Sequence, residues 1–238
     1  QMKAVVCKAW GPPESLVIED RPALEAGPGK VVVSVKAASV KFSDTLLIQN
    51  KYQTKPELPF IPGSEVTGVV KSIGAGVEGW RVGDRVSAQT TYGGYAEEVL
   101  AEADRLAAIP DSIDFTSATG LSSTYGTSYY ALTDRGQLRA GETLLVLGAS
   151  GGVGLAAVEI GKVLGAKVIA CASSEEKLAV CREHGADETI NYDSEDMRAR
   201  VKAITKGKGV DVIIDPVGGA YSELALRDMA WGGRLPVL

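Results

Sequence analysis

The chain has 238 residues, of which 45% are hydrophobic and 23% are charged. This length and balance predict a folded globular chain with room for two modest domains, and they exclude a disordered or fibrous protein. The net charge is −5, and the basic residues do not gather into a stretch that could follow a phosphate backbone, so we expect no nucleic-acid partner.

The sequence also argues against a membrane-spanning segment and against disulfide bonds. No apolar run approaches the length that crosses a bilayer, and the first residues lack a basic, apolar signal segment, so we expect a cytoplasmic protein with no membrane partner. Cys7, Cys171 and Cys181 have no CxxC spacing and are interpreted as reduced thiols of the core.

The pattern of apolar and turn residues changes near residue 125. The first half contains short strand-like segments separated by glycine and proline: MKAVVCKAW, KVVVSVKAAS, EVTGVVKSIGAG, GDRVSAQT and YAEEVLAE. From Gly141 onward, apolar strands alternate with amphipathic helices, the strands being LLVLGA, KVIACA and VDVII. We therefore predict a small β-barrel or curled sheet over residues 1–125 and an α/β, doubly wound parallel sheet over residues 126–238.

Residues 144–170, LLVLGASGGVGLAAVEIGKVLGAKVIA, carry the strongest chemical signal. An apolar strand ends at Gly148, a glycine-rich turn follows, and a helix then runs to Gly165, which ends it. We expect this helix to bury one stripe of side chains, formed by Val153, Ala157, Ile160 and Leu164.

The turn itself has the composition of a dinucleotide-binding loop. Gly151 and Gly152 have no side chain, so a pyrophosphate can approach the backbone, and the N–H groups that open the helix point at its negative charge. Gly154 lets the helix pack closely on the strand. Glycines also simply terminate strands, but the order of strand, turn, helix and strand favours nucleotide binding.

The end of the second strand, KVIACA, favours NADPH over NADH. An NAD site places a carboxylate here, whereas this chain has Ser173 and Ser174. Ser174 can cap the next helix, and Lys177 can lean back toward the strand end, where a ribose phosphate would lie. The alternative is that Ser174 is only an N-cap and Lys177 only a surface lysine.

Six segments show a known pattern along nearly the whole chain: KAVVCKAWGPPESLVIED, LPFIPGSEVTGVVKSIGAGVEGWRVGDRV, GGYAEEVLAEADRLAAIPD, TYGTSYYAL, GASGGVGLAAVEIGKVLGAKVIA and DVIIDPVGG. With them the chain resembles the medium-chain dehydrogenase/reductase superfamily, in its quinone oxidoreductase (zeta-crystallin-like) branch. The resemblance implies a GroES-like β-barrel domain followed by a Rossmann doubly wound parallel-sheet domain, with the substrate in the cleft between them. It also implies a homodimer.

The family continues beyond GGRL through more Rossmann strands and a segment that returns to complete the barrel domain, whereas this sequence ends at Leu238. We therefore expect a C-terminal part of the family fold to be missing from this chain. An edge of the parallel sheet and part of the barrel would then lack their usual cover.

Zinc alcohol dehydrogenases of this superfamily hold their catalytic metal with a cysteine shortly before a TD pair and with the histidine of a GHE motif. The corresponding residues here are Lys41 in VKFSD and Ser64 in GSE, neither of which is a good zinc ligand. The cysteine-rich lobe for a structural zinc is absent, and the only histidine, His184, lies at a helix end. We expect no metal, and we expect Asp44 and Glu65 to form hydrogen bonds inside the barrel.

Transfer of hydride from a nicotinamide to an electron-poor acceptor is the chemistry that remains without a metal or a cysteine nucleophile. Tyr52, in the NKYQ segment that resembles the family's GxY substrate loop, is the candidate donor or substrate clamp, and the alternative is that it only packs the loop. Lys41 departs from the asparagine usual in this branch. Its ammonium can stabilise an oxyanion, and the alternative is that it turns outward.

The resemblance implies cofactor contacts for a set of residues in the second half: Thr127, Ser150, Gly151, Gly152, Val153, Gly154, Ser173, Ser174, Lys177, Tyr192, Val217 and Gly218. Thr127 is expected near the nicotinamide, and residues 150–153 around the pyrophosphate. The side chains after the second and third strands are expected around the adenosine phosphate. Val217 and Gly218, in DPVGG, are expected to line the cofactor cleft at the carboxyl edge of the sheet.

These patterns predict a zinc-independent, NADPH-dependent oxidoreductase that transfers hydride to a quinone or another α,β-unsaturated carbonyl, including an enoyl thioester. The alternative is an NADPH-binding, crystallin-like structural or interaction protein with little turnover. The substrate-loop segment with Tyr52, retained beside the cofactor motif, favours the enzyme.

Overall fold

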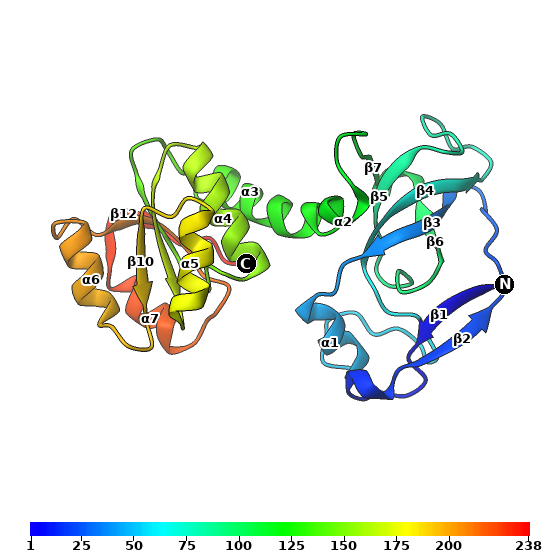
Figure 1. Ribbon diagram of the computed structural model, residues 1–238, viewed down its shortest axis with the longest axis horizontal. Helices are drawn as coiled ribbons and strands as arrows, with labels where there is room; N and C mark the ends of the chain where they lie inside the picture. The colour runs from blue at the N-terminus through cyan, green and yellow to red at the C-terminus, as the bar shows by residue number, and fades with distance from the viewer. The chain divides into compact units, whose positions relative to one another are not determined.

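Two units, Gln1–Leu121 and Ser122–Leu238, make up the computed structural model, which describes residues 1–238 (Figure 1). The boundary predicted from the sequence, between residues 125 and 126, lies in the helical stretch Leu121–Tyr125 and its continuation. None of the helices combines the length and the apolar character that a membrane-spanning segment requires.

The first unit consists of two antiparallel sheets and two short helices. The strands are β1 (Met2–Val6), β2 (Val17–Arg21), β3 (Lys30–Ala38), β4 (Glu65–Ile73), β5 (Arg85–Gln89), β6 (Glu98–Glu102) and β7 (Leu106–Ala108). The first two form a hairpin, and the other five pair in the order β6-β3-β4-β5-β7. The helices are α1 (Phe42–Ile48) and α2 (Phe115–Ala118).

Branched side chains from neighbouring strands form the core of this unit. Val31 and Val33 in β3, Val66 and Val70 in β4 and Val86 in β5 are all buried, because alternate positions along a strand face the same side of the sheet. The ladder between β3 and β4 is irregular at two points, and such bulges bend a strand. The predicted curled sheet is thereby confirmed, while β2 and β7 were not among the predicted strands.

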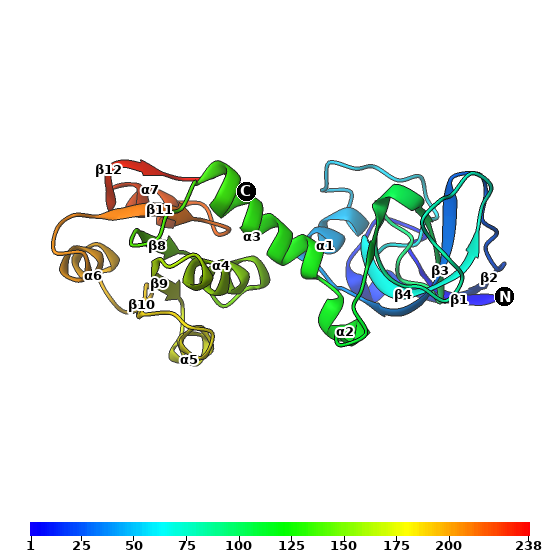
Figure 2. The same cartoon turned by 90° about the horizontal axis from the view of Figure 1, so that it is seen from above.

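The second unit is a parallel sheet with helices on both faces. Its strands are β8 (Thr143–Val146), β9 (Lys167–Ala172), β10 (Glu188–Asn191), β11 (Val210–Ile214) and β12 (Met229–Arg234). They pair in the order β10-β9-β8-β11-β12, which Figure 2 shows from one edge to the other. The helices are α3 (Gly126–Tyr130), α4 (Gly152–Val163), α5 (Glu175–Glu183), α6 (Met197–Ile204) and α7 (Ala220–Leu226).

Alternating residues of these strands pack into two separate clusters. Leu144 and Val146 face α4 and α5 on one side of the sheet, and Leu145 faces α6 and α7 on the other. Strands that are buried on both faces read as continuous apolar runs, which is why LLVLGA, KVIACA and VDVII stood out in the sequence. The doubly wound sheet is therefore confirmed (Figure 1).

The three cysteines lie in the interior of the two units. Cys7, Cys171 and Cys181 are buried free thiols, and burial raises the pKa of each of them.

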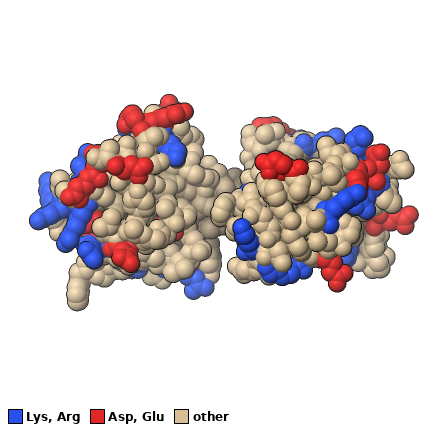
Figure 3. Space-filling view, turned by 90° about the horizontal axis from the view of Figure 1, so that it is seen from below, with Lys and Arg blue, Asp and Glu red and all other residues tan.

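On the face shown in Figure 3, acidic and basic side chains are interspersed on both units with uncharged surface between them.

Helix α4 approaches the sheet with its smallest residues. The predicted stripe is confirmed at three positions: Ala157 is buried, and Ile160 and Leu164 pack against the same core cluster, whereas Val153 is only partly buried. The fully buried residues of the helix are Gly154, Ala156, Ala157, Val158 and Gly161. Glycine and alanine at most of these positions let the helix lie close to the strands.

Gly154 sets the distance of closest approach. A Cβ at this position would lie 2.4 Å from the carbonyl oxygen of Gly148 and 2.8 Å from the Cα of Ala149. Both are backbone atoms, so they cannot move aside as a flexible side chain would. The close packing of α4 on the turn therefore requires glycine, as the sequence suggested.

Gly154→Ala is expected to lower the free energy of unfolding by about 1–3 kcal/mol, because the added methyl group overlaps the backbone of the turn. The control is Gly126→Ala at the start of α3, where a Cβ would meet no atom within 4 Å. That change should leave stability unchanged or raise it slightly. Urea unfolding followed by circular dichroism measures both, and a Gly154→Ala protein as stable as the wild type would contradict the close approach.

Candidate nucleotide and acceptor sites

The turn after β8 presents backbone N–H groups with no side chain in front of them. Gly148 has a φ of 57°, a left-handed conformation that favours glycine, and its carbonyl accepts a hydrogen bond of 3.0 Å from the N–H of Gly151. Gly151 is the N-cap of α4 in an extended conformation, and no side chain caps the helix. The first N–H groups of α4 are therefore available to an anion, and the helix dipole favours negative charge there.

Close neighbours also favour glycine at two positions of the turn. A Cβ on Gly152 would lie 2.9 Å from Cγ2 of Thr124, and one on Gly148 would lie 2.8 Å from Cγ2 of Val217. Gly151 and Gly152 are both exposed, and Ser150 beside them is partly buried. The turn has the conformation expected from the sequence, and its role in binding a nucleotide stays a prediction.

Strand order brings the candidate cofactor residues to one edge of the sheet. β8 lies between β9 and β11. β9 and β10 lie on one side of it and β11 and β12 on the other, so the strand order reverses at β8. In parallel sheets, ligands bind at the carboxyl ends of the strands where this reversal occurs. The glycine turn follows β8, Ser173 and Ser174 follow β9, and Val217 and Gly218 follow β11.

Lys177 reaches back toward the end of β9. Its ammonium donates a hydrogen bond of 2.9 Å to Oγ of Ser173, and its backbone N–H donates one of 3.3 Å to Oγ of Ser174, the N-cap of α5. Both the predicted N-cap and the predicted direction of the lysine are present. The lysine is exposed, so its ammonium is accessible to a ligand. The role that we predicted for it at a phosphate stays a prediction.

Tyr192, which follows β10, packs against a second tyrosine. The rings of Tyr192 and Tyr221 have centroids 4.3 Å apart and an interplanar angle of 33°. The hydroxyl of Tyr221 donates to Oδ1 of Asp193 at 2.8 Å. Sequence reasoning identified Tyr192 but not Tyr221, because α7 is brought to β10 only by the packing of the sheet.

Asp215 orders the loop that carries Val217 and Gly218. Its Oδ1 accepts hydrogen bonds of 2.9 Å from the N–H groups of both residues, and its Oδ2 accepts one from the hydroxyl of Ser222 in α7. An aspartate that follows a strand and precedes proline is typical of such a turn, so the DPVGG segment contained this signal. Asp215 was not among the site residues predicted from the sequence.

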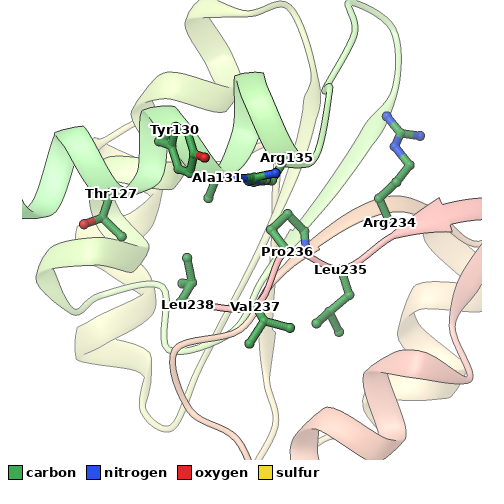
Figure 4. Close-up of a pocket in the computed structure, with 9 residues that line it drawn as sticks. All are labelled: Thr127, Tyr130, Ala131, Arg135, Arg234, Leu235, Pro236, Val237 and Leu238. Carbon is green, nitrogen blue, oxygen red and sulfur yellow. The ribbon is translucent and has the colours of Figure 1, made fainter. Parts of the chain in front are cut away.

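Thr127 is an exposed residue of α3. It lines an open cavity of about 660 Å³ together with Tyr130, Arg135 and the segment 234–238, as Figure 4 shows. The next residue, Ser128, donates a hydrogen bond of 2.7 Å to the carbonyl of Val153 and so ties α3 to the first turn of α4. The expected place of Thr127 near the nicotinamide stays a prediction.

In the first unit, Lys41 pairs with a buried carboxylate. The Nζ of Lys41 lies 3.0 Å from Oε2 of Glu65, whose side chain is fully buried, while the lysine side chain is 22% exposed. Lys41 and Ser64 also line a cavity of about 690 Å³ together with Gln89, Thr90 and Tyr92. The ammonium therefore lies between a buried anion and a polar cavity.

Tyr52 lies in a different environment from Lys41. It packs on an apolar cluster of Cys7, Leu47, Ile48 and Phe60, and it is not among the residues that line the cavity beside Lys41. The two candidate acceptor residues therefore do not share the cavity beside Lys41. The packing of Tyr52 is compatible with either of the two roles that the sequence left open.

The donor set around Lys41 does not suit zinc. A protonated lysine has no lone pair for a metal, and Ser64 offers only a hydroxyl where soft or imidazole ligands are usual. No group of three or more His, Cys, Asp and Glu residues in the structure is placed to hold a metal ion. His184 instead caps the end of α5 and pairs through Nδ1 with Glu159 of α4.

Two protein families match the two units. The family described as "Alcohol dehydrogenase GroES-like domain" matches residues 27–111, and the family described as "Zinc-binding dehydrogenase" matches residues 152–238. Lys41 and Ser64 lie within the first of these two matches.

Individual proteins are similar over nearly the whole chain. A "Quinone oxidoreductase-like protein 2 homolog" of Nematostella vectensis is 42% identical over 98% of this chain, which spans 64% of that relative's length. A probable oxidoreductase of Mycobacterium abscessus is 44% identical with a TM-score of 0.93, covering 98% of this chain and 74% of its own. A quinone oxidoreductase of Thermus thermophilus, whose structure was also determined in complex with NADPH, is 36% identical with a TM-score of 0.85, covering 98% and 72%.

Proposed function

Because this chain belongs to the medium-chain dehydrogenase/reductase superfamily, in its quinone oxidoreductase branch, we propose that it reduces a quinone or another α,β-unsaturated carbonyl with NADPH and without zinc. The observation that carries the proposal is the carboxyl edge of the Rossmann-like sheet. There the N-terminus of α4 has no side-chain cap. Beside it, after β9, Ser173, Ser174 and Lys177 occupy the place where an NAD site has a carboxylate.

The residues of the second unit fit a nicotinamide nucleotide. The backbone of Ser150, Gly151, Gly152 and Val153 would hold the pyrophosphate, since no side chain caps the start of α4 and no Cβ blocks the approach at the glycines. Ser173, Ser174 and Lys177 would hold the ribose phosphate through hydroxyl and ammonium donors. The bound nucleotide supplies the hydride.

The residues of the first unit would act on the acceptor. Reduction of a conjugated carbonyl places negative charge on its oxygen, and a group that stabilises this charge lowers the barrier. The Lys41 ammonium borders a polar cavity and is the candidate for this role. Tyr52 would donate a hydrogen bond to the acceptor or clamp it, and its ring is held by the apolar cluster around it.

The proposed reaction uses no zinc because Lys41 and Ser64, which stand where related enzymes have metal ligands, are poor zinc ligands. An acceptor that is already electron-poor does not need a Lewis acid of this strength, and an ammonium can stabilise the developing oxyanion instead. The names of the relatives support an oxidoreductase, and the NADPH complex of the Thermus thermophilus relative supports the choice of nucleotide. A homodimer remains an expectation from family kinship, and a cytoplasmic location remains an expectation from the sequence.

The purified protein is expected to oxidise NADPH steadily when 1,4-naphthoquinone, an enone or an enoyl thioester is supplied, and a chelator should not change the rate. Absorbance at the NADPH band measures turnover, and elemental analysis measures zinc in the same sample. Tight nucleotide binding without turnover of any acceptor would support the structural alternative. Activity that the chelator abolishes would contradict the zinc-free mechanism.

Tyr52→Phe is expected to lower kcat with a quinone or enone, on the order of a hundredfold if the hydroxyl contacts the developing oxyanion. The Kd of NADPH should not change, because the nucleotide is assigned to the other unit. Tyr129→Phe, at an exposed tyrosine of α3, is the matched control and should leave kcat unchanged. If kcat of Tyr52→Phe equals that of the wild type, Tyr52 is only a packing residue.

Lys177→Ala is expected to weaken NADPH binding about tenfold and to leave NADH binding almost unchanged, because one charge-assisted hydrogen bond to the phosphate is lost. Calorimetric titration of both nucleotides at one salt concentration measures the effect, since salt screens an exposed pair. Lys202→Ala on α6, another exposed lysine of the same unit, should change neither affinity. Equal losses for the two nucleotides in Lys177→Ala would assign the lysine to the fold, and a wild-type preference for NADH would overturn the choice of cofactor.

A further inference from the structure

Two carboxylates lie close to the start of α1 in the first unit, and their surroundings differ. Asp44, in the first turn of α1, accepts hydrogen bonds of 3.0 Å from the backbone N–H of Lys41 and 2.8 Å from the hydroxyl of Tyr95. Burial and the nearby Asp44 carboxylate raise the pKa of Tyr95, so its hydroxyl keeps the proton that it donates. The charge of Asp44 is therefore satisfied without a side-chain cation.

Glu65 has no such support. It is the first residue of β4, its backbone is held by pairing with Gln89 of β5 and by a hydrogen bond from the N–H of Ser39, and its side chain is fully buried. Apart from the ion pair with Lys41, neither carboxylate oxygen has a hydrogen-bond partner. An ionised carboxylate that is buried without a partner is strongly disfavoured, so the charge of Glu65 depends on the Lys41 ammonium.

The position of the Lys41 ammonium is restricted from both ends of the side chain. The backbone N–H is bonded to Asp44 at the N-cap of α1, and the ammonium lies 3.0 Å from Oε2 of Glu65. The side chain is nevertheless 22% exposed and borders the cavity that contains Ser64 and Thr90. An ammonium has three N–H donors, so it can pair with Glu65 and still offer a donor to a ligand in the cavity.

We propose that Glu65 is a positioning residue that holds the Lys41 ammonium at the cavity of the first unit, where this built-in cation stabilises the oxygen of a reduced quinone or enone in place of a metal ion. The inference rests on the proposed function and adds to it the residue that makes Lys41 effective. The acceptor gains two electrons and one hydrogen as hydride, its oxygen gains the negative charge, and a proton from solvent completes the reduction. Acceptors without such an oxygen should gain nothing from the pair.

The test is a cycle of Lys41→Met, Glu65→Gln and the double variant, assayed with NADPH and 1,4-naphthoquinone. Each single change is expected to lower kcat at least tenfold with an unchanged Kd for NADPH. In the Lys41→Met background, Glu65→Gln should cause no further loss, because Glu65 acts only through the lysine. Glu65→Asp keeps the charge and should recover part of kcat. Losses that multiply in the double variant, or a Glu65→Gln protein with wild-type kcat, would overturn the proposal.

Stability supplies a readout that does not depend on activity. Lys41→Met leaves the buried carboxylate unpaired, so it should lower Tm, and adding Glu65→Gln should raise Tm again. If the two changes are simply additive in Tm, the ion pair does not hold the lysine, and the proposal is wrong whatever the activity.

Glu98→Gln provides the matched control in the same unit. Glu98 is also buried, pairs with Lys71 and accepts a hydrogen bond of 3.0 Å from the N–H of Leu24. Its replacement should lower Tm without changing kcat, and an equal loss of kcat there would assign the effect of Glu65→Gln to general destabilisation. A stable wild type that turns over no quinone, enone or enoyl thioester would overturn the proposed function itself and this inference with it.

Discussion

The contact between Gly154 and the backbone of Gly148 and Ala149 is the constraint on which the second unit depends. It lets α4 lie against β8 with its buried side made of small residues, and it directs the N-terminus of the helix to the carboxyl edge of the sheet. The uncapped N–H groups and their position beside the ends of β9 and β11 follow from that placement. Nucleotide binding is thus proposed at a site created by backbone packing, to which side chains such as Lys177 add selectivity.

Charge burial governs the first unit in a different way. Asp44 is satisfied by an N–H and a hydroxyl, which are neutral donors, whereas Glu65 depends on the ammonium of Lys41. A metal at this place would require ligands that the chain does not have, and the lysine provides positive charge without them. The same pair that makes burial of Glu65 tolerable leaves an ammonium at the border of a polar cavity. Stability and the proposed chemistry therefore rest on one interaction.

Much of the fold was readable from local patterns. Continuous apolar runs marked the strands that are buried on both faces, and Gly165, with a φ of 82°, ended α4 where its sequence position predicted. Ser174 was predicted as an N-cap from its residue type and place, and it accepts the N–H of Lys177. The buried side of α4 was predicted less well. Hydrophobic periodicity identified Ala157, Ile160 and Leu164, which pack in the core, but it cannot identify a buried glycine such as Gly161, which the close approach to the sheet requires.

The sequence by itself indicated most strands of the two units, the glycine turn, the absence of a carboxylate after β9 and the presence of Lys41 and Ser64 where related enzymes have metal ligands. These features are local, because each depends on residue types at neighbouring positions. Only the tertiary structure decided that Lys41 meets Glu65, that Tyr221 packs on Tyr192 and that Tyr52 is not among the residues lining the cavity beside Lys41. Each of these relations joins residues from separate elements, and strand order and helix packing set the distances between them.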